Sequence, residues 1–325
     1  MLEIDVELSR AVYDTVRRAA SGAAGVPGRL TAALARVVMG RPEFGSQAPH
    51  IACDPQAWFA VSRMSDAAFW SGQERLYGYL DEHLAASVDV LAPYLPAVTD
   101  MRRVPIAVHP VPGLTTCYGA PHGGQLFGLY DGADPREMLL FLSHTYFHEL
   151  SSTLNSERSR QAEADPRSAD RFRHWLLLLI RNEGIANYAV LGPLRQLRST
   201  GIEFRYFTYA GLVDNRDATA AAMSACRDLL STLDDATVRH VSRRVSAVLK
   251  NTRLPVINLI GIHMAEAIAA RDGERALLDV DGLEPEEFFL RYADTGDALC
   301  THLFGPDGAA VPAVIGPAAS VRSGS

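Results

Sequence analysis

The sequence predicts a predominantly helical α+β protein with one small β-sheet. Apolar residues recur at helical spacing through most of the 325 residues. Residues 104–130 instead combine β-branched and aromatic residues with glycine and proline, which is typical of short strands. The chain is 48% hydrophobic and 21% charged, an ordinary composition for a globular protein with a sizeable core.

Three parts are expected along the chain. They are an N-terminal helical region packed on the core, a main domain and a flexible tail, over residues 1–100, 101–305 and 306–325. Within the first part, residues 1–40 are expected to be helical, with a break at Pro27-Gly28. A second helix is expected over about 65–92, before two prolines end it.

The sheet and the helix after it have clear local signals. Three short segments that are rich in β-branched and aromatic residues predict two or three strands, at 104–111, 114–120 and 125–132. A helix over about 135–155 follows. Asp134 is its expected N-cap, Pro135 fits the first helical position, and Glu137 is expected to complete a capping box.

The rest of the chain is predicted to be helical up to the tail. A polar and charged loop is expected over 155–170. Periodic apolar segments then predict five helices, at about 168–190, 216–233, 235–251, 256–271 and 285–292. The residues after Gly305 are expected to be disordered or loosely attached because they lack apolar periodicity.

Composition and charge exclude several classes of partner. The net charge is −7 and no long basic run is present, so nucleic acid is not an expected partner. The N-terminal residues do not resemble a signal peptide, which makes a cytoplasmic location the expectation. The longest apolar run is too short to span a bilayer. Four dispersed cysteines form no CxxC pair and are expected to be reduced thiols. Oligomeric state is left open.

Two histidines on the predicted helix 135–155 are candidate metal ligands. A helix advances about 100° per residue, so His144 and His148 lie about 40° apart on one face, one turn from each other. Two imidazoles at this spacing can bind one ion, as in HExxH peptidases. The pattern alone is weak evidence in a chain with ten histidines.

Glu183 strengthens the metal interpretation. It lies in a very apolar predicted helix, where an ionised carboxylate is costly unless it is paired or bound to metal. The small residues Gly184 and Ala186 beside it would permit close packing against the histidine helix. The alternative is an ordinary pair of Glu183 with Arg181 or His174.

These motifs resemble a known family. His144 and His148, followed 35 residues later by Glu183-Gly184-Ile185-Ala186, are similar to gluzincin-type zinc peptidases. They are closer still to bacterial families of predicted zinc-dependent peptidases with HExxH and then EGxA. The likeness covers about residues 104–295. It implies a gluzincin-like domain in which His144, His148 and Glu183 bind Zn²⁺, with a peptide or small molecule as substrate.

The chain departs from that family at the residue after the first histidine. Related proteins have glutamate there as a general base, whereas this chain has Thr145, which cannot accept a proton at neutral pH. Glu149 follows the second histidine and points about 120° from the mean direction of the pair. A structural or supporting role for Glu149 is therefore preferred, and a displaced catalytic base is the alternative. Asn187 also replaces an aspartate that can fix a ligand histidine.

The missing glutamate leaves three hypotheses. The first is a zinc-dependent hydrolase with an atypical base. The second is a non-peptidase metalloenzyme of specialised metabolism with oxidative, lyase or cyclase chemistry, because two histidines and one carboxylate also describe the Fe²⁺ sites of non-haem oxygenases. The third is a non-catalytic relative that retains the metal. His263 and Tyr188 are further candidates for substrate binding or hydrogen bonding at the site, with simple packing as the alternative for each.

Overall fold

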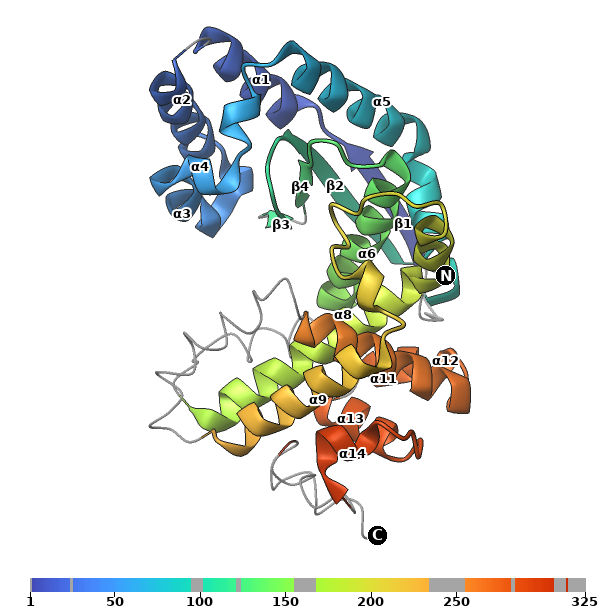
Figure 1. Cartoon of the computed structure of the whole chain (residues 1–325). Helices are drawn as coiled ribbons and strands as arrows, with labels where there is room; N and C mark the ends of the chain where they lie inside the picture. The colour runs from blue at the N-terminus through green and yellow to red at the C-terminus, as the bar shows by residue number, and fades with distance from the viewer. Residues whose placement is uncertain are drawn as a thin grey trace. The chain divides into compact units, whose positions relative to one another are not determined.

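The computed structural model describes residues 2–23, 26–94, 102–120, 124–154, 168–233, 255–281, 284–306 and 314 (Figure 1). The chain forms two compact units. The first comprises Met1–Ala92, Pro96–Glu149 and Ser199–Phe207. The second comprises Pro93–Leu95, Leu150–Arg198 and Thr208–Ser325. The predominantly helical α+β class that the sequence predicts is confirmed.

A four-stranded sheet lies in the first unit. Its strands are β1 (Leu2–Leu8), β2 (Arg102–Pro112), β3 (Cys117–Ala120) and β4 (Gly124–Leu129). Their order is β1-β2-β4-β3. β2 pairs in parallel with both β1 and β4, whereas β3 pairs antiparallel to β4 at the edge. The three strands predicted between residues 104 and 132 are therefore confirmed.

The prediction of a helical N-terminus is wrong for its first residues. Leu2–Leu8 forms β1 and pairs with β2 in a register that matches Ile4 to Val104 and Val6 to Ile106. Its side chains alternate, with Ile4 and Val6 half-buried and the acidic residues between them exposed. The period of two is hard to recognise in the sequence because the segment is short and leads directly into an amphipathic helix.

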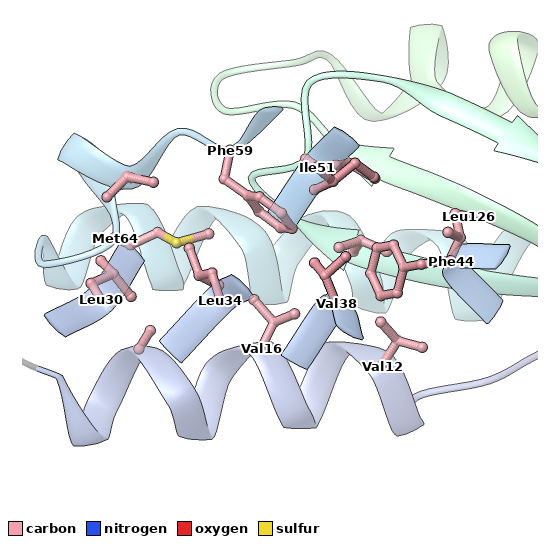
Figure 2. Packing of buried hydrophobic residues seen from close by; sticks show 14 of the residues in the cluster. Val12, Val16, Leu30, Leu34, Val38, Phe44, Ile51, Phe59, Met64 and Leu126 are labelled. Carbon is pink, nitrogen blue, oxygen red and sulfur yellow. The ribbon is translucent and has the colours of Figure 1, made fainter. Parts of the chain in front are cut away.

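The helices of the first unit enclose a core that begins at the N-terminus. They are α1 (Ala11–Gly22), α2 (Pro27–Met39), α3 (Ala48–Cys53), α4 (Pro55–Trp58), α5 (Ala67–Asp89) and α6 (Pro135–Leu154), the last of which continues into the second unit. Figure 2 shows Val16 of α1, Leu34 of α2 and Ile51 of α3 among the side chains of this core. Leu126 of β4 joins the same cluster.

The start of α6 follows the prediction only in part. Asp134 caps the helix, since its Oδ1 accepts a hydrogen bond from the Arg136 backbone N–H at 2.8 Å. Glu137 does not complete a capping box. Its carboxylate instead accepts bonds from the backbone N–H groups of residues 205–207, at 2.6 to 3.0 Å. Three successive N–H groups satisfy a fully buried carboxylate better than the single N-cap amide would.

The second unit is helical. Its elements are α8 (Ala169–Arg198), α9 (Arg216–Ser231), α11 (Val256–Asp272), α12 (Arg275–Asp281), α13 (Pro285–Ala293) and α14 (Cys300–Phe304). α8 extends past its predicted end at 190 and through Pro193. The predicted helix 235–251 lies outside the described residues, as do nearly all of the predicted loop and the tail. Among the described helices, none is both long and apolar enough to cross a bilayer.

Two glycines let α8 and α11 cross closely. A Cβ atom added to Gly184 would lie 2.5 Å from the Gly261 carbonyl oxygen, and one added to Gly261 would lie 2.4 Å from the Ile180 carbonyl oxygen. Real Cβ atoms do not approach backbone this closely. The close neighbour of Gly184 is therefore the backbone of α11, and its expected contact with the histidine helix stays a prediction.

Replacing Gly261 by alanine is expected to destabilise the protein. The added methyl group meets backbone on α8, which cannot move aside as a side chain can, so the helices must separate at a cost of about 1–3 kcal/mol. Gly192→Ala on α8 is the matched control. It meets nothing within 4 Å and is expected to stabilise the protein slightly. Thermal unfolding checks both, and an unchanged melting temperature for Gly261→Ala would contradict the role of this crossing.

Candidate metal centre

The first unit carries the expected histidine pair on α6. His144 and His148 are one helical turn apart, and their Nε2 atoms lie 3.1 Å from each other. The ring centroids are 4.6 Å apart and the rings are nearly perpendicular, at 83°. His144 is buried, whereas His148 is half-buried. The two imidazoles thus bring the same type of nitrogen to one place, as the helical spacing predicts.

The separation of these nitrogens fits a shared metal ion. Zinc binds imidazole nitrogen at about 2.0–2.1 Å in tetrahedral geometry, which places two such nitrogens about 3.3 Å apart. The 3.1 Å between the two Nε2 atoms is close to that value. The other interpretation is a direct hydrogen bond, which needs a proton on one of the two nitrogens. On geometry and donor chemistry, the pair fits two ligands of one zinc site.

Aromatic rings fix the orientation of the first histidine. Phe141 stacks on His144 with ring centroids 5.4 Å apart and an interplanar angle of 18°. Phe207 meets the same imidazole edge to face, at 6.1 Å and 85°. The loop that carries Phe207 is held by the Glu137 carboxylate through backbone N–H groups. The His144 ring therefore packs against one ring from α6 itself and one from a distant loop.

Thr145 is bound to the sheet. Its hydroxyl lies 2.9 Å from Gln125 Oε1 and 2.8 Å from the Leu142 carbonyl oxygen. Gln125 Nε2 donates in return to the Thr145 carbonyl oxygen at 3.0 Å. Gln125 is a buried residue of β4, so this reciprocal contact joins the sheet to α6. Related families have a catalytic base at this position, whereas Thr145 makes a structural contact there.

Glu149 lies against the edge strand of the sheet. A Cβ atom built on Gly119 of β3 would lie 2.9 Å from Glu149 Oε1, so the carboxyl group lies close against this strand. Glu149 is half-buried. Burial raises its pKa, and the adjacent His148 opposes that shift. The side chain is thus placed beside β3, in agreement with the sideways direction expected from the helical geometry.

In the second unit, two amides orient the Glu183 carboxylate. Its Oε2 accepts a hydrogen bond from Asn258 Nδ2 at 3.2 Å and one from Asn187 Nδ2 at 3.4 Å. Asn258 comes from α11, and Asn187 lies one turn along α8 from Glu183. Both donors act on the same oxygen. This arrangement is a supporting shell of the kind that fixes a ligand carboxylate.

Asn187 acts on the Glu183 carboxylate. It is completely buried, its Nδ2 also donates to the Glu183 carbonyl oxygen at 2.7 Å, and its Oδ1 accepts a bond from the Tyr209 hydroxyl. The sequence comparison had assigned this position to the support of a histidine. Asn258 and Tyr209 were not among the predicted site residues. The only signal for Asn258 was a single amide within the apolar start of α11.

The two remaining candidates have other partners in the second unit. The ring of Tyr188 meets that of Tyr94 edge to face, with centroids 6.0 Å apart. The Nε2 of His263 lies 3.0 Å from Asp297 Oδ1, which also accepts a bond from the Tyr292 hydroxyl at 3.1 Å. These contacts account for both side chains as packing and pairing groups. A role for either in a reaction stays a prediction.

A second group of His and Glu side chains lies in the second unit. His174 Nδ1 is 3.1 Å from Glu286 Oε1, and Glu284 completes a group whose ligand atoms lie within 4.8 Å of one another. The hydrogen bond to Glu286 raises the pKa of His174. We interpret this contact as an ion pair between α8 and the start of α13. His174 therefore pairs with Glu286. The sequence left open a pair between His174 and Glu183, and the structure gives His174 this other partner.

Together, the fold and the histidine pair define a class of protein. A helix that presents two histidines one turn apart beside a small sheet is typical of metal-dependent enzymes. Residues 74–295 match the family described as "Putative zinc dependent peptidase (DUF5700)", and the chain belongs to this family. The likeness to zinc-dependent peptidases that the motifs predict is thereby confirmed. Neither the curated proteins nor the solved structures contain a match.

Proposed function

We propose that this protein is a zinc-dependent hydrolase of amide or peptide bonds whose metal is bound by His144, His148 and Glu183. The single observation that carries the proposal is the 3.1 Å separation of the two Nε2 atoms, which suits two ligands of one ion. Membership of a family described as zinc-dependent peptidases supports zinc over iron. The gluzincin-like arrangement of the domain belongs to the same proposal, and so does a cytoplasmic location.

Each ligand has a support that suits its role. Phe141 and Phe207 restrict the ring of His144, so its Nε2 keeps one direction. Asn187 and Asn258 both donate to the Oε2 atom of Glu183, which fixes the direction of the carboxylate. Zinc bound by such a set supplies a Lewis acid and lowers the pKa of a bound water. The chain itself contributes the binding and orientation of the ion.

Proton transfer is the unusual feature of the proposed site. Thr145 cannot accept a proton, and its hydroxyl is engaged with Gln125. Glu149 is the carboxyl group that α6 offers one turn further along, beside β3. We assign it the proton-carrying role in hydrolysis, which is the alternative that the sequence left open. Glu149→Gln should then abolish hydrolysis without loss of bound zinc, whereas a merely supporting Glu149 would leave turnover largely intact.

Metal analysis tests the proposal directly. Protein purified without added metal is expected to contain about one zinc per chain, as one mononuclear site requires, and to cleave members of a peptide library. His263→Ala and Tyr188→Phe, measured in the same assay, test the two remaining candidates. Zinc content near zero together with no cleavage after zinc is supplied would contradict the proposal and leave a non-catalytic relative.

One observation favours a second candidate function. Thr145 makes hydrogen bonds with Gln125 of the sheet. The position of the usual base therefore has a structural role in this chain. Two histidines and a carboxylate can equally bind Fe²⁺ for oxidative chemistry, which needs no base at this position. Iron in the purified protein and oxygen consumption with a small-molecule substrate would support this candidate against the hydrolase.

Restoring the usual base should raise hydrolysis. Thr145→Glu places a carboxylate at the position used by related families, and general-base catalysis contributes about 10²–10⁴-fold to a rate. The control is Thr145→Gln, which has the same size and also breaks the contact with Gln125 but cannot accept a proton. Initial rates on the best library peptide provide the measurement. Equal rates for the two variants would contradict the view that a carboxylate at position 145 is better placed than Glu149 to act as the base.

A further inference from the structure

An open surface cavity of about 650 Å³ lies between α1 and α2 in the first unit, and its volume is within the range of small-molecule sites. Four arginines line it: Arg18 from α1, Arg29 and Arg36 from α2, and Arg41 just after α2. The other lining residues are mostly alanine and glycine. No acidic residue belongs to the lining. The part of the chain that the family matches starts only at residue 74.

Helical periodicity shows that this surface is built by two complete helix faces. On α1 the lining residues are 15, 18, 19 and 22. On α2 they are 29, 32, 33, 36 and 37, and Gly40 follows as the C-cap of this helix. Both sets follow the i, i+3, i+4, i+7 spacing of one face. The opposite faces carry the apolar side chains of the core, such as Val16 and Leu34 in Figure 2. Alanine and glycine residues thus line the centre of the cavity, and the arginines surround them.

Three of these arginines have no acidic partner. Within the described part of the chain, Arg18 donates only to Thr15 Oγ1, and neither Arg29 nor Arg36 forms an ion pair. Arg41 contacts Glu43 at 3.6 Å, but its other nitrogen points to Thr15 and the Ala11 carbonyl oxygen. Elsewhere on α1 the pattern differs, since the neighbouring Arg17 is paired with Glu74. The cavity therefore collects cationic groups that the protein leaves unneutralised.

The local charge contrasts with that of the whole protein. Residues 11–41 contain five arginines and a single acidic residue, Asp14, whereas the chain carries a net charge of −7. The positive charges in this stretch are all arginines, as are 30 of the 31 lysine and arginine residues of the whole chain. The planar guanidinium group binds phosphate oxygens through two parallel hydrogen bonds, which is why arginine is preferred at such sites.

We propose that the cavity between α1 and α2 binds a ligand with two or more phosphate groups, held by Arg18, Arg29, Arg36 and Arg41. Its floor of alanine and glycine leaves room for the body of the ligand, and the arginines neutralise its charge. The site is separate from the proposed metal centre and does not rest on hydrolysis. The phosphates belong either to a soluble metabolite or to lipid headgroups, which share this chemistry.

Calorimetric titration of the full chain with fructose 1,6-bisphosphate tests a soluble source. The double variant Arg29→Gln/Arg36→Gln is expected to weaken binding by about tenfold or more per arginine, because each loses a charge-assisted hydrogen bond. The matched control, Arg75→Gln/Arg216→Gln, removes the same charge from exposed residues outside the cavity and should bind like the wild type. Binding should also weaken as salt is raised.

Flotation with phosphatidylcholine vesicles containing phosphatidic acid tests a lipid source with the same variants. Binding of either probe supports the proposal if Arg29→Gln/Arg36→Gln loses it and the control keeps it. Two outcomes overturn the proposal: neither probe binds the wild type, or the cavity variant binds as tightly as the control. Circular dichroism verifies that the variants fold. Zinc content and hydrolysis should not change in either variant, so failure here is distinct from failure of the proposed metal centre.

Discussion

Alanine in place of His148 is expected to remove the bound zinc and every activity that depends on it. Two imidazoles at one-turn spacing provide half of a tetrahedral ligand set, and one imidazole with one carboxylate is too few for tight binding. Loss of a supporting group alone weakens a metal site by about 10–100-fold, so loss of a ligand should exceed that range. His144→Ala and Glu183→Ala should behave alike. The measurement is zinc per chain after dialysis against a competing chelator.

The controls for this experiment come from the same chain. His174→Ala removes a histidine that pairs with Glu286, and it should leave zinc content unchanged. Asn258→Ala removes an amide that holds the Glu183 carboxylate, and it should give an intermediate loss of affinity. If Glu183→Ala retains as much zinc as the wild type, the carboxylate is not a ligand. If His144→Ala and His148→Ala also retain zinc, the contact between these two side chains is better explained as a hydrogen bond.

The sequence predicts those parts of the candidate site whose geometry is local. The spacing of His144 and His148 follows from the turn of one helix, and that helix was predicted almost to its ends. The partners of Glu183 could not be predicted in the same way. Asn258 lies 75 residues away along the chain, and no local pattern relates the two side chains. The position of Gly261 against Gly184 is a long-range property for the same reason.

Elsewhere in the fold, long-range contacts decide what local patterns leave ambiguous. Residues 2–8 fit a strand or the start of an amphipathic helix, and pairing with β2 selects the strand. Asp134 and Glu137 match a capping box, yet the carboxylate of Glu137 binds a loop 68 to 70 residues further on. Local signals thus identified the helix correctly but assigned the wrong partner to one of its buried groups.

Alanine in place of Glu137 is expected to destabilise the protein strongly. The carboxylate is fully buried and accepts hydrogen bonds from the backbone N–H groups of Arg205, Tyr206 and Phe207. Burial raises the pKa of Glu137, and those three N–H groups oppose the shift because they bind the ionised form. Without the carboxylate, three buried donors lose their acceptor. Each buried N–H group that is left without an acceptor costs about 1–3 kcal/mol.

Thermal and denaturant unfolding measure this effect, and Glu137→Gln is the matched control. Glutamine has the same size and keeps one acceptor oxygen, but its NH₂ group faces donors, so an intermediate loss is expected. The loop held by Glu137 also carries Phe207, whose ring packs against His144. Glu137→Ala should therefore weaken zinc binding as well, although Glu137 is not a ligand. A variant with wild-type stability would show that solvent or another group satisfies these N–H donors. The Glu137 carboxylate would then have no role in holding Phe207 against His144.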